Sequence, residues 1–176
     1  RDKVAERVEF RRAVVAQMQE AQNWSELAEI IVKMPGSIVS AERTWLMAQR
    51  SNEDKFDLIT RWERPGTGQL LPYPLISPAV CARCENAKSL EETKITTCQH
   101  LEADNNNGSH YTRHCLWLSP NGRGKTALLF DLDMDHPLDS AQVEVLNDLS
   151  NEMSLIIDNA NLQYVEQRQG DVARNE

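Results

Sequence analysis

The segment KTALLFDLDMDHPLDSAQVEVL, residues 125–146, decides the fold because it changes from strand to helix within a few residues. Leu128, Phe130 and Leu132 have the two-residue spacing of one strand face. After the link DHPLD, Asp139 or Ser140 is positioned to cap the helix that follows. We therefore expect a strand that leads through a short link into a long helix.

The segments around this one predict an antiparallel sheet. HYTRHCLWL (110–118) precedes SPNGRG, whose asparagine and glycines are typical of a hairpin turn. ERTWLMAQ (42–49) and KFDLITRWE (55–63) predict a second hairpin, and TKITTC (93–98) predicts a further strand. The alternation within 55–63 predicts a shared face for Phe56, Leu58, Thr60 and Trp62.

Helices are expected before the sheet as well as after it. Residues 1–22 are charged and contain neither glycine nor proline. A second helix begins after Asn23, which with Glu26 forms an N-terminal capping pattern, and Pro35-Gly36 is expected to weaken or end it. The predicted fold is α+β: a five- or six-stranded antiparallel sheet with helices packed on one face, and long helices at both termini.

The terminal helices carry narrow apolar stripes at three-and-four spacing, which is typical of a helix that meets one other helix. We expect them to pair in a homodimer, with these contact residues: Val4, Val8, Val15, Met18, Leu146, Leu149, Met153 and Ile156.

Composition narrows the classes of partner. The chain has 176 residues and a formal net charge of −8, which disfavours nucleic acid and anionic membranes. No apolar run reaches the roughly 20 residues of a membrane span, so we expect no membrane insertion and a cytoplasmic location. The chain starts at Arg1 rather than methionine, and we expect it to be a fragment of a longer protein.

On these elements the chain resembles a GAF domain, the small sensory module of histidine kinases, phosphodiesterases and cyclase-type signalling proteins. The resemblance rests on SELAEIIVKM, the paired strands of 42–63 and the segment 114–163. It implies that residues 64–111 form a lid over a ligand pocket on the sheet face opposite the helices. We expect three parts: a signalling and dimerisation helix (1–22), a sensory domain (23–163), and a helix end with a frayed tail (164–176).

Cysteines and histidines suggest chemistry in the lid region. Their spacing is C-x2-C-x13-C-x-H, followed by an adjacent His-Cys pair, and thiolates and imidazoles are the ligands of zinc and iron–sulfur clusters. A second CxxC is missing, so three interpretations stay open: a metal or cluster, redox thiols or a disulfide, and plain thiols in which Cys115 acts as a small hydrophobe. The metal or redox candidates are Cys81, Cys84, Cys98, His100, His114 and Cys115. The ligand-pocket candidates are Trp62, Tyr73, Cys81, Cys84 and Trp117.

Two further motifs are interpreted as structural. NGRGKT lacks the first glycine of a phosphate loop, since Ser119 holds that position, and it leads into a strand. DLDMD lacks the glycine and distal glutamate of a calcium loop, and we expect Asp131 and Asp133 to share a solvated face.

The predicted function is therefore non-catalytic sensing of a small ligand, a metal or a redox state through a cysteine-containing pocket. The terminal helices would relay the signal to an output domain in the same parent chain, for instance a sensor histidine kinase. The alternative is a cysteine-dependent enzyme resembling free methionine-(R)-sulfoxide reductase, although its GRGVCG-like stretch has no convincing counterpart here.

Overall fold

A computed structural model describes residues 3–49, 56–66, 94–97, 111–118 and 126–175, apart from the side chains of residues 3, 4, 7 and 160–175. The elements, in chain order, are α1 (Lys3–Gln19), α2 (Trp24–Ile38), β1 (Ala41–Gln49), β2 (Phe56–Glu63), β3 (Ile95–Thr97), β4 (Tyr111–Trp117), β5 (Thr126–Asp133) and α4 (Ser140–Asn175). This α+β arrangement, with five antiparallel strands in the described residues, confirms the predicted fold class. The expected lid lies largely outside the described residues.

Strand β5 is the centre of the sheet. The strand order is β2-β1-β5-β4-β3, so β5 pairs antiparallel with β1 on one side and with β4 on the other. All its residues from Thr126 to Leu132 are buried. Both edges of β5 are hydrogen-bonded, and its side chains are buried on both faces of the sheet. The strand therefore contributes residues to the core beneath the helices and to the opposite face.

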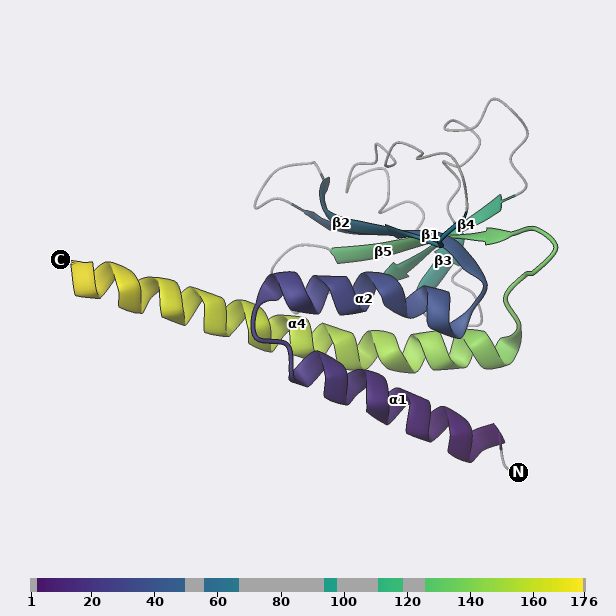
Figure 1. The fold of residues 1–176 in the computed structure, drawn as a ribbon, viewed down its shortest axis with the longest axis horizontal. Helices are drawn as coiled ribbons and strands as arrows, with labels where there is room; N and C mark the ends of the chain where they lie inside the picture. Colours follow the sequence, from purple (N-terminus) through teal and green to yellow (C-terminus); the bar gives the residue numbers. More distant parts are fainter. Residues whose placement is uncertain (1–2, 50–55, 67–93, 98–110, 119–125, 176) are drawn as a thin grey trace.

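Helices α2 and α4 cover one face of the sheet, and α1 packs against α4 on the side away from the strands (Figure 1). The core between sheet and helices includes Leu46, Leu116, Leu128, Phe130 and Leu146, each at most 1% exposed. Burial of such a side chain stabilises the fold by about 1.5–3 kcal/mol relative to leaving it exposed. None of the described helices has the length and apolar character of a membrane span.

Both predicted helix caps are confirmed. Asn23 Oδ1 accepts a hydrogen bond from Glu26 N at 2.9 Å, and Glu26 Oε2 accepts one from Gln22 N at 2.8 Å. At α4, Asp139 Oδ1 accepts from Gln142 N at 2.7 Å, while Asp139 N donates to Gln142 Oε1 at 3.1 Å. Each cap supplies an acceptor for an N–H that the helix itself leaves unpaired.

Helix α2 continues through Pro35 and Gly36 to Ile38, rather than ending there. Proline lacks the N–H that would bond to the preceding turn, but Pro35 is buried in the core, and its own carbonyl accepts from Val39 N at 2.9 Å. The apolar packing of the last turn outweighs the lost hydrogen bond.

A bulge in β2 changes which side chains share a face. Met47 pairs with Leu58, whereas Leu46 pairs with Thr60, so Ile59 is an extra residue in the ladder. Phe56 and Leu58 therefore lie on the face away from the helices, while Thr60 and Trp62 lie on the helix side. The prediction that these four residues share one face is wrong.

Trp62 docks the edge of the sheet onto α2 at Gly36. A Cβ atom added to Gly36 would lie 2.5 Å from Cη2 of Trp62, well inside van der Waals contact. The absence of a side chain at Gly36 is what allows the indole to lie against the helix.

We therefore expect Gly36→Ala to lower the free energy of unfolding by about 1–2 kcal/mol, since the overpacking exceeds the gain in helix propensity. In a Trp62→Leu background the same change should cost nothing or stabilise, because the ring is gone. Chemical denaturation of the wild type, the two single variants and the double variant gives the double-mutant cycle. Ser37→Ala, at the exposed next position, is the control. An equal loss in both backgrounds would contradict the contact.

Candidate functional site

The sheet face that none of the described helices covers, called the helix-free face below, has an apolar half. Its buried members come from four strands: Trp45, Met47, Phe56, Cys115, Trp117, Ala127 and Leu129. Trp117 Nε1 donates to Thr96 Oγ1 at 3.1 Å, and the Trp117 ring lies 6.5 Å from that of Phe56. The aromatic side chains are therefore held in fixed positions by neighbours on both sides.

The other half of this face holds three buried charged residues in a line. Asp131 of β5 pairs across the sheet with Arg43 of β1 and with Arg113 of β4. The exposed fractions are 1% for Asp131 and 4% for each arginine. Charged groups are rarely buried so fully unless they are paired, so this Arg43–Asp131–Arg113 row is the most unusual polar feature of the described residues.

The two arginines are not held equally. Arg113 Nε donates to Asp131 Oδ1 at 2.8 Å and Arg113 Nη2 donates to Asp131 Oδ2 at 3.2 Å, a two-bond fork. Arg43 Nη1 lies 3.9 Å from Asp131 Oδ2, an ion pair that is too long for a hydrogen bond. Among the described residues, Arg43 Nε and Nη1 are buried and have no hydrogen-bond partner.

Aromatic rings support both cations. The guanidinium carbon of Arg43 lies 4.8 Å from the centre of the Tyr111 ring, and that of Arg113 lies 4.7 Å from the centre of the Trp45 ring. The negative ring faces stabilise positive charge but supply no acceptor to the two unpaired nitrogen atoms of Arg43. The formal charges of these three buried side chains sum to +1.

This row was not predicted from the sequence. The prediction that Asp131 shares a solvated face with Asp133 is wrong, because Asp131 is only 1% exposed. The available signal was an acid inside an otherwise apolar strand, TALLFDL, together with one arginine inside each of two other predicted strands.

The structure separates His114 from Cys115. Cys115 lies in the apolar half of the helix-free face, whereas His114 points to the helix side, where its ring lies 5.6 Å from that of Phe130. Adjacent strand residues face opposite ways, so these two cannot ligate one metal together. Within the described ranges, no three His, Cys, Asp or Glu side chains are grouped for metal binding.

The two remaining candidates in the described residues lie on opposite faces of the sheet. Trp117 lies on the helix-free face, but Trp62 lies on the helix side because of the bulge, which removes it from that face. Five candidates fall outside the described residues: Tyr73, Cys81, Cys84, Cys98 and His100.

Several predicted dimer residues are used within the chain. Met18, Leu146, Leu149 and Met153 are at most 2% exposed and belong to the core beneath the sheet. The stripes on α1 and α4 thus serve the packing of the two helices against each other and the domain, and these four side chains are not available to a second copy. The side chain of Val4 lies outside the described part.

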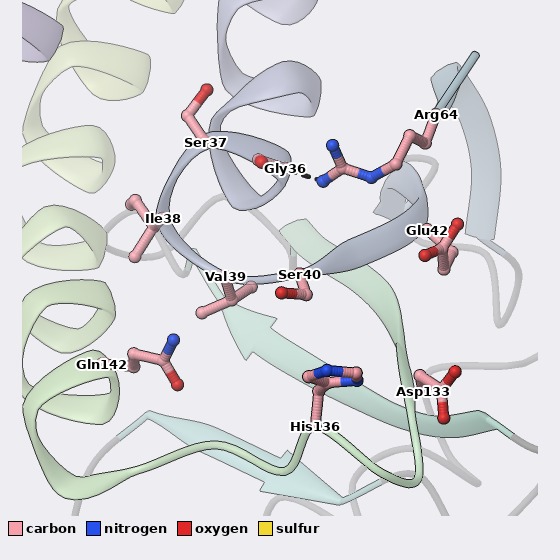
Figure 2. Close-up of a pocket in the computed structure, with 10 residues that line it drawn as sticks. All are labelled: Gly36, Ser37, Ile38, Val39, Ser40, Glu42, Arg64, Asp133, His136 and Gln142. Carbon is pink, nitrogen blue, oxygen red and sulfur yellow. Dashed lines mark hydrogen bonds between the residues drawn. The ribbon is translucent and has the colours of Figure 1, made fainter. Parts of the chain in front are cut away.

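A separate polar pocket of about 530 Å³ lies between the end of α2, the start of β1 and the link from β5 to α4 (Figure 2). Arg64 enters it from one side, but its Nη2 donates to the carbonyls of Gly36 and Ala41, both at 3.0 Å. Asp133 and His136 lie across from it. Because its arginine is engaged by the backbone, this pocket is a weaker candidate than the helix-free face.

Comparisons with known proteins identify the architecture. No family model and no curated protein matches the chain. Among solved structures, it is similar to the GAF domain from Acinetobacter phosphoenolpyruvate-protein phosphotransferase, with a TM-score of 0.62 and 10% identity over 92% of this chain and 97% of that one. The GAF domain of a putative sensor histidine kinase from Pseudomonas syringae pv. tomato gives a TM-score of 0.60 at 11% identity, covering 94% of each chain.

A third similar structure is larger. The chromophore-binding domain of an unusual bacteriophytochrome from R. palustris gives a TM-score of 0.67 at 12% identity, over 93% of this chain and 65% of that one. At these identities the likeness establishes the fold.

Burial of His114 predicts a pH dependence of stability. Desolvation lowers the pKa of His114 from 6.5 to about 4, so the folded protein keeps the imidazole neutral where the unfolded chain takes up a proton. The free energy of unfolding should therefore fall as pH falls from 6.5 towards 4, by about 3 kcal/mol from this group over the whole window. Urea denaturation of wild type and of His114→Gln across pH 4–8 isolates the effect, because the carboxylates contribute equally to the two proteins. If the free energy of unfolding has the same pH dependence in both, the prediction is contradicted.

Proposed function

Because the chain has a GAF-like fold, we propose that it is a non-catalytic sensory domain that binds a small ligand against the helix-free face. The observation that carries this proposal is that face itself, where buried tryptophans adjoin a buried charged row. Apolar surface with a few fixed polar groups is the usual composition of a small-molecule site. The fold likeness to GAF domains of a putative sensor histidine kinase and of a phosphotransferase supports a regulatory role.

A parent signalling protein would supply the output. The described elements form a sheet and its covering helices, and the proposed role needs an effector domain in the same longer chain, such as a kinase. We also propose a cytoplasmic location.

Strand β5 offers a physical path for the relay. Its residues alternate between the two faces: Leu129 and Asp131 lie on the helix-free face, while Phe130 and Leu132 pack against the helices. The strand then leads through residues 134–139 into α4. A ligand that shifts Asp131 would move this packed strand relative to α4, and packed elements favour discrete alternative positions.

Homodimerisation through the terminal helices is part of the proposal. Since four of the expected seam residues are buried within the chain, pairing must use other faces. Leu155 of α4 is 60% exposed and is one apolar side chain that such a pairing would cover.

Cys115 is the one cysteine among the described residues, and the proposal gives it a packing role. It is 6% exposed within the apolar half of the helix-free face, which fits a small hydrophobic side chain beside the ligand. Sensing by metal or by thiol oxidation stays a prediction that depends on residues outside the described part.

A ligand screen tests the proposal. Freshly purified protein is examined by native mass spectrometry, elemental analysis and absorption, then screened with metabolites by thermal unfolding. We expect a saturable rise in Tm that weakens in Trp117→Phe, on the helix-free face, and persists in Trp62→Phe, on the helix side.

Two results would contradict parts of the proposal. Binding that is equally sensitive to both tryptophan changes, or no binding at all, argues against a site on this face. Steady consumption of methionine sulfoxide with a thiol reductant argues against a non-catalytic domain. Light scattering of the same samples tests the dimer, which a monomer at every concentration would exclude.

A further inference from the structure

The buried charged row is incomplete as an ion-pair network. Asp131 carries one negative charge and faces two arginines, one on each neighbouring strand. Both of its carboxylate oxygens already accept hydrogen bonds from Arg113. Arg43 is left with a single long ion pair of 3.9 Å to Oδ2.

The consequence is a buried cation with unused donors. Arg43 is 4% exposed, so water does not replace the missing acceptors, and within the described residues Nε and Nη1 have none. A buried donor without a partner, and a buried charge without full compensation, are each costly to the folded state. Tyr111 stabilises the charge through its ring but leaves the two N–H groups unsatisfied.

From this geometry we infer that the anchoring group of the ligand is an oxyanion, a carboxylate or a phosphate, that accepts hydrogen bonds from Arg43. This inference rests on the proposed function, because it names the chemistry of a ligand on the same face. An oxyanion offsets the positive charge of Arg43 and supplies an acceptor to one of its two unpaired nitrogen atoms, either Nε or Nη1, because these two point to different edges of the guanidinium plane.

Other ligand chemistries satisfy only part of this requirement. A neutral carbonyl group accepts hydrogen bonds but leaves the row positively charged. A metal cation or an amine adds a further positive charge beside Arg43. The anchoring anion also lies next to an apolar surface that begins one pleat further along the strands, at Trp45, Cys115 and Leu129.

Anion-dependent stabilisation tests the inference with inorganic phosphate and acetate as probes. Thermal unfolding is followed in bis-Tris chloride at constant ionic strength, with sodium chloride replaced stepwise by either probe. Wild type should gain Tm in a saturable way with at least one of them. Arg43→Met should weaken that apparent affinity roughly tenfold or more, because a charge-assisted hydrogen bond is lost.

A matched control separates the site from general surface charge. Arg12→Met removes the same charge from an exposed position of α1 and should leave the anion effect unchanged. Where Arg43→Met does not fold, Arg43→Lys replaces it, and the side-chain Nε–H resonances of wild type, observed by NMR during the phosphate titration, show directly whether Arg43 responds.

The inference is overturned if neither probe produces a saturable shift, or if Arg43→Met responds as wild type does. The proposed function can fail separately: a neutral metabolite that binds through Trp117 and is indifferent to Arg43→Met removes the oxyanion but keeps the ligand site. If the metabolite screen finds no ligand on this face and the two probes have no effect, the proposed function and the oxyanion inference are both contradicted.

Discussion

A carboxylate in the middle of the central strand constrains the rest of this structure. Asp131 lies in β5, which is hydrogen-bonded on both edges, and the side chain is almost completely removed from water. It needs cationic partners, and the sheet provides them at the directly opposite positions of β1 and β4. A one-residue slip of either strand would move its arginine to the helix side, so the carboxylate fixes the register of three strands at once.

The same strand connects the candidate site to the helices. On its helix side β5 contributes Leu128, Phe130 and Leu132 to the main core, and on its other side it contributes Leu129 and Asp131 to the site. The side chains of β5 therefore contact the candidate site on one face and the core beneath α4 on the other. In the proposed function this strand would connect ligand binding to α4, through the link of residues 134–139.

Local signals predicted much of the fold. The alternation of β5 and the capping residues Asn23 and Asp139 act over a few residues, and these predictions are confirmed. Strands β4 and β5 pair antiparallel as predicted, whereas the turn SPNGRG lies outside the described residues. The errors come from tertiary packing. The bulge at Ile59 follows from pairing with β1, and helix α2 passes through Pro35 because the core accepts that ring.

The candidate site was predictable only in part for the same reason. Alternation places Asp131 and Cys115 on a face opposite Phe130 and His114, but it does not tell which face is buried. Arg43 and Arg113 are 70 residues apart and meet Asp131 only through cross-strand register, which no local pattern encodes. Arg113 forms two hydrogen bonds to Asp131, whereas Arg43 lies 3.9 Å from it and forms none. Only the three-dimensional structure shows this difference.

The most direct measurement of this account is the free energy of unfolding of Asp131→Asn compared with Asp133→Asn, two residues along the same strand. Loss of the Asp131 charge leaves two buried arginines without a counter-charge, and we expect a loss of about 3–5 kcal/mol. Asp133 is half-buried, and asparagine can still accept from Asp135 N there, so its change should be small. Equal and small effects at both positions would show that the carboxylate of Asp131 does not hold the sheet together.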